Sequence, residues 1–335
     1  MKLGKLATLV VALTVALVSG WSSSGEAITL PTCDNFICAF DGDFAVMSLP
    51  FAGVSVPSSP GQISSGVVIY TGSSGKPVTT NFAGMDNAFA APNGSQAQNF
   101  TTTTAKSDPG GTGQFAGDVQ SWDSTMAAFT TFLNGSTPLF FFNQNDTNSA
   151  GTNGACPGAL DAQDVCLYGS ITLVDLQNSA NNVTFELEAP NRLFTDGPGT
   201  TDGIATLPSE LVLAKGDVCL DATGAQTNCD GSGNPVVVGP VNHNLGADHA
   251  AYVGFSDVLN ALLAACATFG VNSAQCPWDS ISIRFDLADI NNGFEQLFIL
   301  TTEQVRLIPA PGTFILLGAG LVGLGASAWR RRQRG

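Results

Sequence analysis

The chain has 335 residues, of which 44% are hydrophobic and only 12% are charged, and its formal net charge is −15. The acidity is concentrated between residues 28 and 308, which hold 26 acidic and six basic residues, so this part carries a net charge of −20. Such a surface repels nucleic acid and anionic lipid, which excludes nucleic-acid-binding classes, and it attracts divalent cations. The length allows one large domain or two small ones, and we expect one.

The first 27 residues have the pattern of a secretory signal peptide. Lys2 and Lys5 precede an apolar run from Leu6 to Val18, and mostly small and polar residues follow as far as Ala27. A basic start, a short apolar centre and small residues at the −3 and −1 positions are typical of such signals. We therefore predict export through the Sec machinery, cleavage after Ala27 and a mature chain that begins at residue 28.

Eight cysteines fall into four pairs that are close in sequence. The pairs are Cys33/Cys38, Cys156/Cys166, Cys219/Cys229 and Cys266/Cys276. An even number of cysteines, an export signal and the paired spacing together predict four disulfides that form in an oxidising compartment. Zinc is the alternative, but paired zinc ligands are usually separated by two to four residues, and only the first pair comes close to that spacing.

Alternation of apolar and polar residues predicts a mainly β ectodomain over residues 28–305. The clearest cases are Asn182–Glu188 and Ser280–Leu287, in which every second side chain is apolar, as in an antiparallel strand with one buried face. Shorter candidate strands are Val67–Tyr70, Leu139–Phe142, Ser170–Asp175, Glu210–Lys215, Val236–Val238, Tyr252–Phe255, Leu297–Thr302 and Gln304–Leu307. Many short strands separated by turn residues predict an antiparallel β-sandwich of jelly-roll type.

One short helix is predicted after Ser256. Ser256 is suited to cap it, Asp257 suits its first turn, and Gly270 follows its end. The apolar residues at helical spacing are Val258, Leu259, Leu262, Leu263 and Cys266. A disulfide from Cys266 to Cys276 would tie the last turn of this helix to the strand that starts at Ser280.

Few residues point to a ligand site or to catalysis. His243 and His249 are the only histidines, and with Asp248 they could hold a metal ion, although loop or strand-end histidines fit the pattern better. Asp286 and Asp289, near a predicted turn, are the best candidate pair for calcium, with solvated turn residues as the alternative. No Gly-x-Ser-x-Gly motif is present and the cysteines are assigned to disulfides, so no catalytic residue is predicted. No cofactor is predicted, although calcium binding stays possible.

The last 27 residues combine three parts. Pro309–Gly312 comes first, an uncharged apolar stretch from Thr313 to Trp329 follows, and the end is basic, with Arg330, Arg331, Arg332 and Arg334. The 20 residues from Ala310 to Trp329 are long enough to cross the hydrocarbon core as a helix, since lipid offers no partner for open backbone groups. The arginines stop transfer and stay in the cytoplasm. We predict a sorting segment over 306–335 with a transmembrane helix over 313–329.

This tail resembles the PEP-CTERM sorting signal that exosortases recognise. Pro309, Ala310 and Pro311 occupy the namesake tripeptide, with Ala310 where the family has Glu, and the apolar and basic parts follow in the family's order. The resemblance implies that an exosortase-like enzyme cuts the tail near the tripeptide. It also implies a transient single-pass anchor and delivery to the surface or extracellular matrix of a polysaccharide-producing Gram-negative bacterium.

Taken together, the patterns and the resemblance favour an exported, non-enzymatic protein with a structural or adhesive role in the matrix of a biofilm or floc. Its expected partners are an exosortase-like enzyme, the Sec machinery and extracellular polysaccharide. Two other classes stay open. One is a secreted module that binds calcium or carbohydrate, and the less favoured one is a secreted hydrolase that depends on His243 or Asp248.

Overall fold

The structure is a computed structural model that describes residues 38–58, 63, 65–71, 81–90, 98–102, 121–143, 166–187, 217–222, 226–242, 249–290 and 295–305. All of these residues belong to one compact unit, Thr29–Val305. The predicted signal peptide, the predicted strand Glu210–Lys215 and the sorting segment 306–335 lie outside the described residues. The described part of the chain is mainly β.

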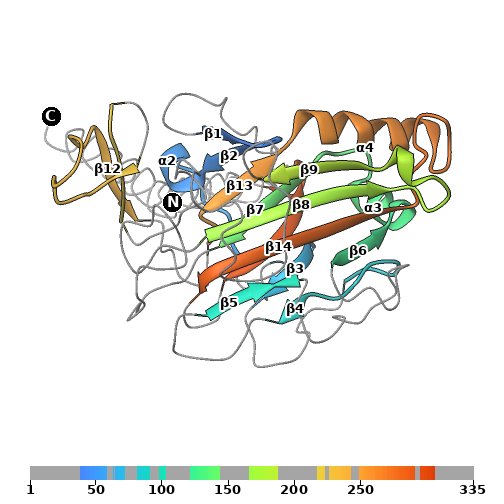
Figure 1. The fold of residues 1–335 in the computed structure, drawn as a ribbon, viewed down its shortest axis with the longest axis horizontal. Helices are drawn as coiled ribbons and strands as arrows, with labels where there is room; N and C mark the ends of the chain where they lie inside the picture. Colours follow the sequence, from blue (N-terminus) through green and yellow to red (C-terminus); the bar gives the residue numbers. More distant parts are fainter. Residues whose placement is uncertain are drawn as a thin grey trace, which may run out of the picture. The chain divides into compact units, whose positions relative to one another are not determined.

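The larger of the main sheets has seven strands in the order β1-β2-β13-β7-β15-β3-β4 (Figure 1). The strands are β1 Cys38–Asp41, β2 Phe44–Ser48, β3 Val67–Thr71, β4 Phe89–Ala90, β7 Pro138–Asn143, β13 Tyr252–Phe255 and β15 Gln296–Thr301. Neighbouring strands are antiparallel except β3 and β4, which run parallel. Residues on both faces of β2, β3 and β15 are buried, so these strands lack the alternation of a half-exposed strand.

The smaller main sheet is built around β14 (Ser280–Ile290), which lies between β5 (Gln98–Thr101) and β8 (Cys166–Val174). β9 (Val183–Leu187) forms the edge beyond β8, and β6 (Trp122–Thr125) also pairs with β14. The predicted alternation of β14 is confirmed. Its buried members are Ile281, Ile283, Phe285 and Leu287. The strand is longer than predicted because its pairing with β8 continues to Ala288.

A separate three-stranded sheet has the order β11-β10-β12. Its strands are β10 Asp217–Leu220, β11 Gln226–Thr227 and β12 Val238–Asn242. The predicted strand Val236–Val238 is therefore displaced, since β12 starts where that prediction ends. The predicted strand Gln304–Leu307 was wrong at Gln304. This residue lies in a turn, in which its N–H donates a hydrogen bond to the Thr301 carbonyl.

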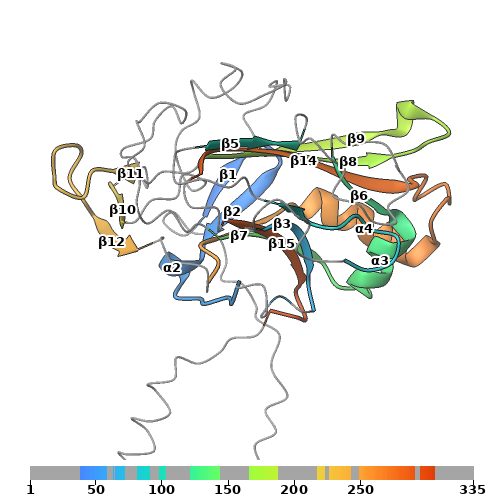
Figure 2. The same cartoon turned by 90° about the horizontal axis from the view of Figure 1, so that it is seen from below.

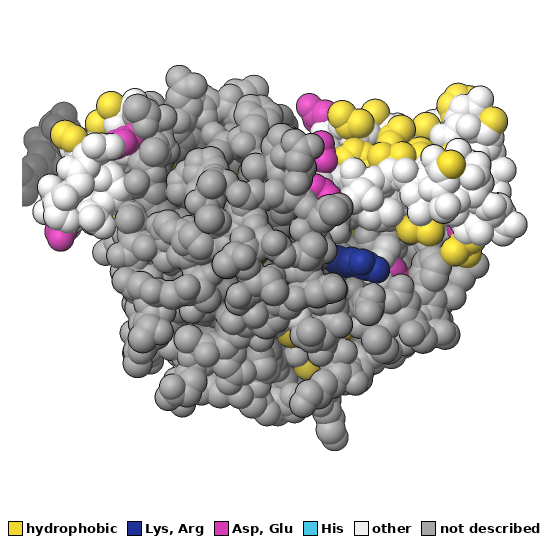
Figure 3. Space-filling model, viewed as in Figure 1, with side chains coloured by type: hydrophobic (Ala, Val, Ile, Leu, Met, Phe, Trp, Pro, Cys, Tyr) yellow, Lys and Arg dark blue, Asp and Glu magenta, His cyan; other side chains and the backbone are white. Residues whose placement is uncertain are grey.

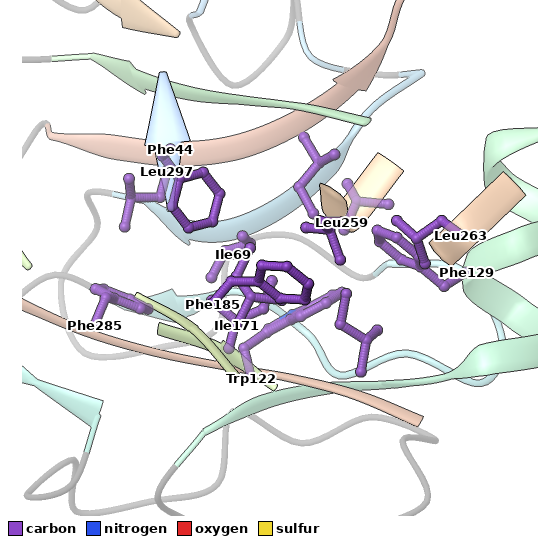
Figure 4. Close-up of a cluster of buried hydrophobic side chains, with 14 of the residues drawn as sticks. Phe44, Ile69, Trp122, Phe129, Ile171, Phe185, Leu259, Leu263, Phe285 and Leu297 are labelled. Atoms are coloured by element: carbon purple, nitrogen blue, oxygen red, sulfur yellow. The ribbon is translucent and has the colours of Figure 1, made fainter. Parts of the chain in front are cut away.

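The two main sheets pack face to face, and Figure 2 shows them as two layers. Side chains from both layers form one hydrophobic cluster. Figure 4 shows Phe44 and Leu297 of the larger sheet on one side and Phe285 and Ile171 of the smaller sheet on the other. The same cluster continues to Trp122 and to the helices at one end of the layers. This inter-sheet core positions the candidate site.

The predicted helix is present as α4 (Asp257–Phe269). Ser256 Oγ accepts a hydrogen bond from the Leu259 N–H at 3.4 Å, and Gly270 ends the helix with a φ of 84°. The buried face consists of Leu259, Leu263 and Cys266. Val258, predicted to lie on the apolar face, is instead 64% exposed, because it lies roughly 100° around the helix from the centre of the buried face.

Two helices accompany the single predicted one. α3 (Met126–Leu133) buries Met126, Phe129 and Leu133, and Thr125 Oγ1 caps it by accepting from the Ala128 N–H at 3.1 Å. α2 (Leu49–Ala52) is a single turn after β2. Within the part of the chain that the structure describes, no helix is both long and apolar enough to span a membrane.

Apolar side chains gather on the outer surface over α4, as the space-filling view shows (Figure 3). On this helix Val258 is 64% exposed and Phe269 is 58% exposed. Asp257 is the only charged residue in α4, so the outer face of this helix differs from the acidic composition of residues 28–308.

Candidate functional site

A cavity of about 90 Å³ lies between the two main sheets. Its walls on the larger sheet include Phe44, Val46, Phe140, Phe142, Tyr252 and Leu297. Its walls on the smaller sheet include Leu167, Ile171, Leu187, Ile283 and Phe285. Among the residues around the cavity, only Ser170, Arg284 and Tyr252 have polar groups in their side chains, and the Tyr252 group is its hydroxyl. Strand alternation directs the Ser170 and Arg284 side chains to the other face, because their neighbours Ile171 and Phe285 point inward.

Two glycines, one in each main sheet, line this space. Gly254 of β13 is paired with Val46 and Phe140, and Gly169 of β8 is paired with Phe285 and Leu187, so both occupy inward positions. A Cβ built on Gly254 would lie 3.9 Å from the nearest atom, the Phe140 carbonyl oxygen. Neither glycine has the positive φ that would require glycine. The missing side chain of Gly254 therefore leaves room where the layers would otherwise interdigitate, whereas a Cβ on Gly169 would lie 3.2 Å from the Arg284 carbonyl oxygen.

Aromatic rings make one wall of the cavity stiff. The Phe285 ring stacks on Phe100 with a centroid distance of 5.3 Å, and Tyr70 meets Phe285 edge-to-face at 5.6 Å. Burial raises the pKa of the Tyr70 hydroxyl well above its usual value, and the nearby Glu295 carboxylate raises it further. On the opposite wall, Phe44 and Phe140 meet edge-to-face at 6.1 Å. Such pairs hold the rings in place without filling the space between the sheets.

A pair of hydrogen bonds joins the two sheets beside the cavity. The Asp43 N–H, in the turn between β1 and β2, donates to the Glu186 carbonyl at 2.9 Å. In return, the Glu186 N–H of edge strand β9 donates to Asp43 Oδ2, also at 2.9 Å. Phe44 and Leu187, the next residues in each chain segment, line the cavity. We call this pair the Asp43–Glu186 latch.

The side chains of the latch carry an electrostatic conflict. Partial burial raises the pKa of the Glu186 carboxyl, and the neighbouring Asp43 carboxylate raises it further. Asp43 itself is stabilised by accepting the Glu186 N–H, since such charge-assisted hydrogen bonds are strong. The backbone of Glu186 therefore stabilises the latch, whereas its charged side chain weakens it.

Two of the four predicted disulfides are formed in the described part of the chain. Cys219 and Cys229 are bonded within the three-stranded sheet, and Cys266 and Cys276 are bonded as predicted, at the end of α4 just before β14. Both bridges join residues ten apart in the sequence. Cys33 and Cys156 lie outside the described residues, as do the predicted sorting residues Pro309, Ala310 and Pro311 and the arginines Arg330, Arg331, Arg332 and Arg334.

The predicted calcium pair lies in a strand rather than in a turn. Asp286 and Asp289 both belong to β14, which continues to Ile290. Among the described residues, no group of three or more His, Cys, Asp or Glu side chains is arranged to hold a metal ion. His249 forms an isolated β-bridge with Pro57. His243 and Asp248 lie outside the described residues.

A model of a domain of unknown function, DUF8239, matches residues 28–286. That match covers well over half of the chain. The chain belongs to the DUF8239 family. The DUF8239 region contains every described strand except β15 and the last residues of β14, and it includes both glycines of the cavity. No curated protein matches the chain, and no solved structure matches it either.

Sequence reasoning missed the cavity and the latch of this DUF8239 protein. Gly169 and Gly254 interrupt apolar strand segments, and a glycine inside a strand is a signal of close approach or missing packing. That signal applies to each glycine by itself. The two glycines line one cavity only because the two sheets pack together, and no local sequence pattern predicts that packing.

Proposed function

We propose that this DUF8239 protein is exported, folds with disulfides outside the cytoplasm and has a structural or adhesive, non-enzymatic role at the cell surface or in the extracellular matrix. An exosortase-like enzyme would remove the tail near Pro309–Pro311 and release the ectodomain from its transient membrane anchor. Extracellular polysaccharide is the expected partner of the released protein.

The observation that carries this proposal is the pair of short-loop disulfides, Cys219–Cys229 and Cys266–Cys276. Reducing compartments keep such cysteines as thiols, whereas exported domains use them to stabilise loop-rich folds. The start of the family match at residue 28 gives further support, because a signal peptide cut after Ala27 would leave the matched region intact.

We also propose the finer fold assignment, a β-sandwich of jelly-roll type. Five connections between described strands support it, since the chain passes between the two main sheets from β4 to β5, from β6 to β7, from β7 to β8, from β13 to β14 and from β14 to β15. Repeated passage between sheets is the connectivity of jelly rolls. The parallel β3–β4 pair and the extra strands of the larger sheet are additions to that pattern.

The test is fractionation of the native host combined with thiol labelling. Cells producing the full chain are compared with cells producing a variant that ends at Val305. We expect the product of the full chain in the washed surface and matrix fraction, with its cysteines unreactive until a reductant is added. The truncated variant should appear mainly in the medium, because it lacks the sorting segment. A cytoplasmic product with freely reactive thiols would contradict the proposal.

A further inference from the structure

We propose that the cavity between the two main sheets is a binding site for a neutral, apolar group about the size of one aromatic ring. This inference is independent of the export and sorting of the protein. It rests on the size, lining and rigidity of the cavity.

The cavity is larger than the gaps of ordinary core packing. Protein interiors are packed as densely as organic crystals, and gaps larger than a water molecule are few. A volume of about 90 Å³ is several times what one water requires, and it approaches that of engineered apolar cavities that take up benzene. Gly169 and Gly254, one in each sheet, occupy inward positions beside the space, and neither has a strained backbone.

The lining selects the chemistry of the ligand. Phe44, Phe140, Phe142, Ile171, Leu187 and Phe285 surround the space with carbon. A charged ligand would lose its hydration without gaining a partner, and a hydroxyl placed among these side chains would be left without its hydrogen bonds. A flat hydrocarbon group loses nothing on transfer and gains contacts with rings on both sides.

The walls are preformed, which limits the entropic cost of binding. The backbone hydrogen bonds of β8, β13 and β14 fix the strands that carry the walls. The Asp43–Glu186 latch ties the edges of the two sheets together next to Phe44 and Leu187. Sites for small molecules are usually largely formed before binding.

Thermal unfolding of the full chain in benzene or phenol vapour tests the proposal. A fixed vapour pressure keeps the activity of the free ligand constant, even if some of the ligand dissolves in other parts of the sample. We expect benzene at about ten times its dissociation constant to raise the unfolding midpoint by about 2 °C or more. Phenol has the same ring with a hydroxyl that finds no partner, and it should bind about tenfold or more weakly.

Two variants localise the effect. Gly254→Val places three carbons in the cavity and should abolish the benzene response, whereas Thr184→Val, on the exposed face of β9, should retain it. If Gly254→Val does not fold, Gly254→Ala serves instead, because its methyl group has room and should reduce the response. The proposal is overturned if benzene leaves the midpoint of the parent chain unchanged, or if the response survives filling the cavity.

Discussion

Two glycines in or beside the larger sheet differ in the room that their backbone leaves for a side chain. Gly254 has an ordinary φ, and a Cβ there would make only ordinary van der Waals contacts, the nearest at 3.9 Å, whereas the Cβ of Gly66 would lie 2.6 Å from Leu300 Cδ2 and 2.9 Å from the Ile299 carbonyl oxygen. The two positions therefore respond in opposite directions to the same added methyl group. At one of them the methyl fills a cavity, and at the other it overlaps its neighbours.

Gly254→Ala should raise the free energy of unfolding by about 1–2 kcal/mol. A buried methyl group and the reduced freedom of the unfolded chain both contribute to this gain. Urea unfolding, with the midpoint and slope fitted separately, provides the measurement. Gly66→Ala is the control and should destabilise the protein. If Gly254→Ala proves as damaging as Gly66→Ala, then the space at Gly254 is not open.

The Glu186 carboxyl is expected to weaken the fold at neutral pH. Its pKa is raised by burial and by Asp43, so folding favours the protonated form. Glu186→Gln should therefore increase stability at neutral pH, and the gain should disappear as the pH falls through the folded pKa, because the parent side chain is then neutral too. Chemical unfolding at several pH values measures this. A gain that is the same at every pH would contradict the electrostatic cause.

Asp175 should stabilise the turn between β8 and β9 only when it is ionised. Its pKa is lowered by hydrogen bonds from the Asn181 side chain at 2.7 Å and from the backbone N–H groups of Gln177 and Asn178. This contribution is complete above the unfolded value, ordinarily near 3.8, and is lost as the pH falls through the folded value. Asp175→Asn should thus be less stable than the parent at neutral pH, and the difference should shrink in acid.

The exposed Glu303→Gln variant is the control for this prediction, because it also removes one negative charge but lies on the surface. Unfolding midpoints at neutral pH and at about pH 3 decide the question. If Asp175→Asn is destabilised as much in acid as at neutral pH, then the loss of stability does not come from the charge of Asp175.

At the scale of whole elements, the Cys266–Cys276 bridge fixes the end of α4 to the segment that leads into β14. Both sulfur-bearing residues are buried, and the helix packs Leu259 and Leu263 into the inter-sheet cluster. The position of the helix is therefore set at its start by the Ser256 cap, along its length by packing, and at its end by a covalent bond.

Replacing both Cys266 and Cys276 by alanine should lower the free energy of unfolding by about 2–3 kcal/mol, the chain-entropy value for a loop of this length. Hydrogen exchange should accelerate in the last turn of α4 before it does so in β14. The double alanine variant at Cys219 and Cys229 opens a loop of equal separation and should leave exchange in α4 unchanged. If the variant without Cys266 and Cys276 keeps the parent's stability and hydrogen-exchange rates, then the bridge does not stabilise the fold.

Elements defined by local pattern were predicted well from the sequence. β14 alternates because one face is buried, and α4 has a cap, a buried face and a terminal glycine within a short segment. β2 was missed because all five of its residues are buried, which removes the alternation. α3 was also missed, although Thr125 as a cap, apolar residues at helical spacing and Asn134-Gly135 after its end are readable signals.

The arrangement of the whole molecule could not be predicted in this way. β2 pairs with β13, which follows it by about two hundred residues, and that pairing decides that Gly254 lies opposite Val46. The Asp43–Glu186 latch likewise joins segments that no local pattern relates. The proposed sorting signal is the reverse case, because it would be recognised by the linear order of its parts, which needs no tertiary structure.

The most direct test of export and processing is the intact mass of the protein recovered from the surface and medium of its native host under non-reducing conditions. We predict a chain that starts at Ile28 and ends within Pro309–Gly312, with or without an added group, and with two hydrogens fewer for each disulfide. A mass that retains Arg334 and Gly335, or one that shows eight free thiols, would contradict the proposal.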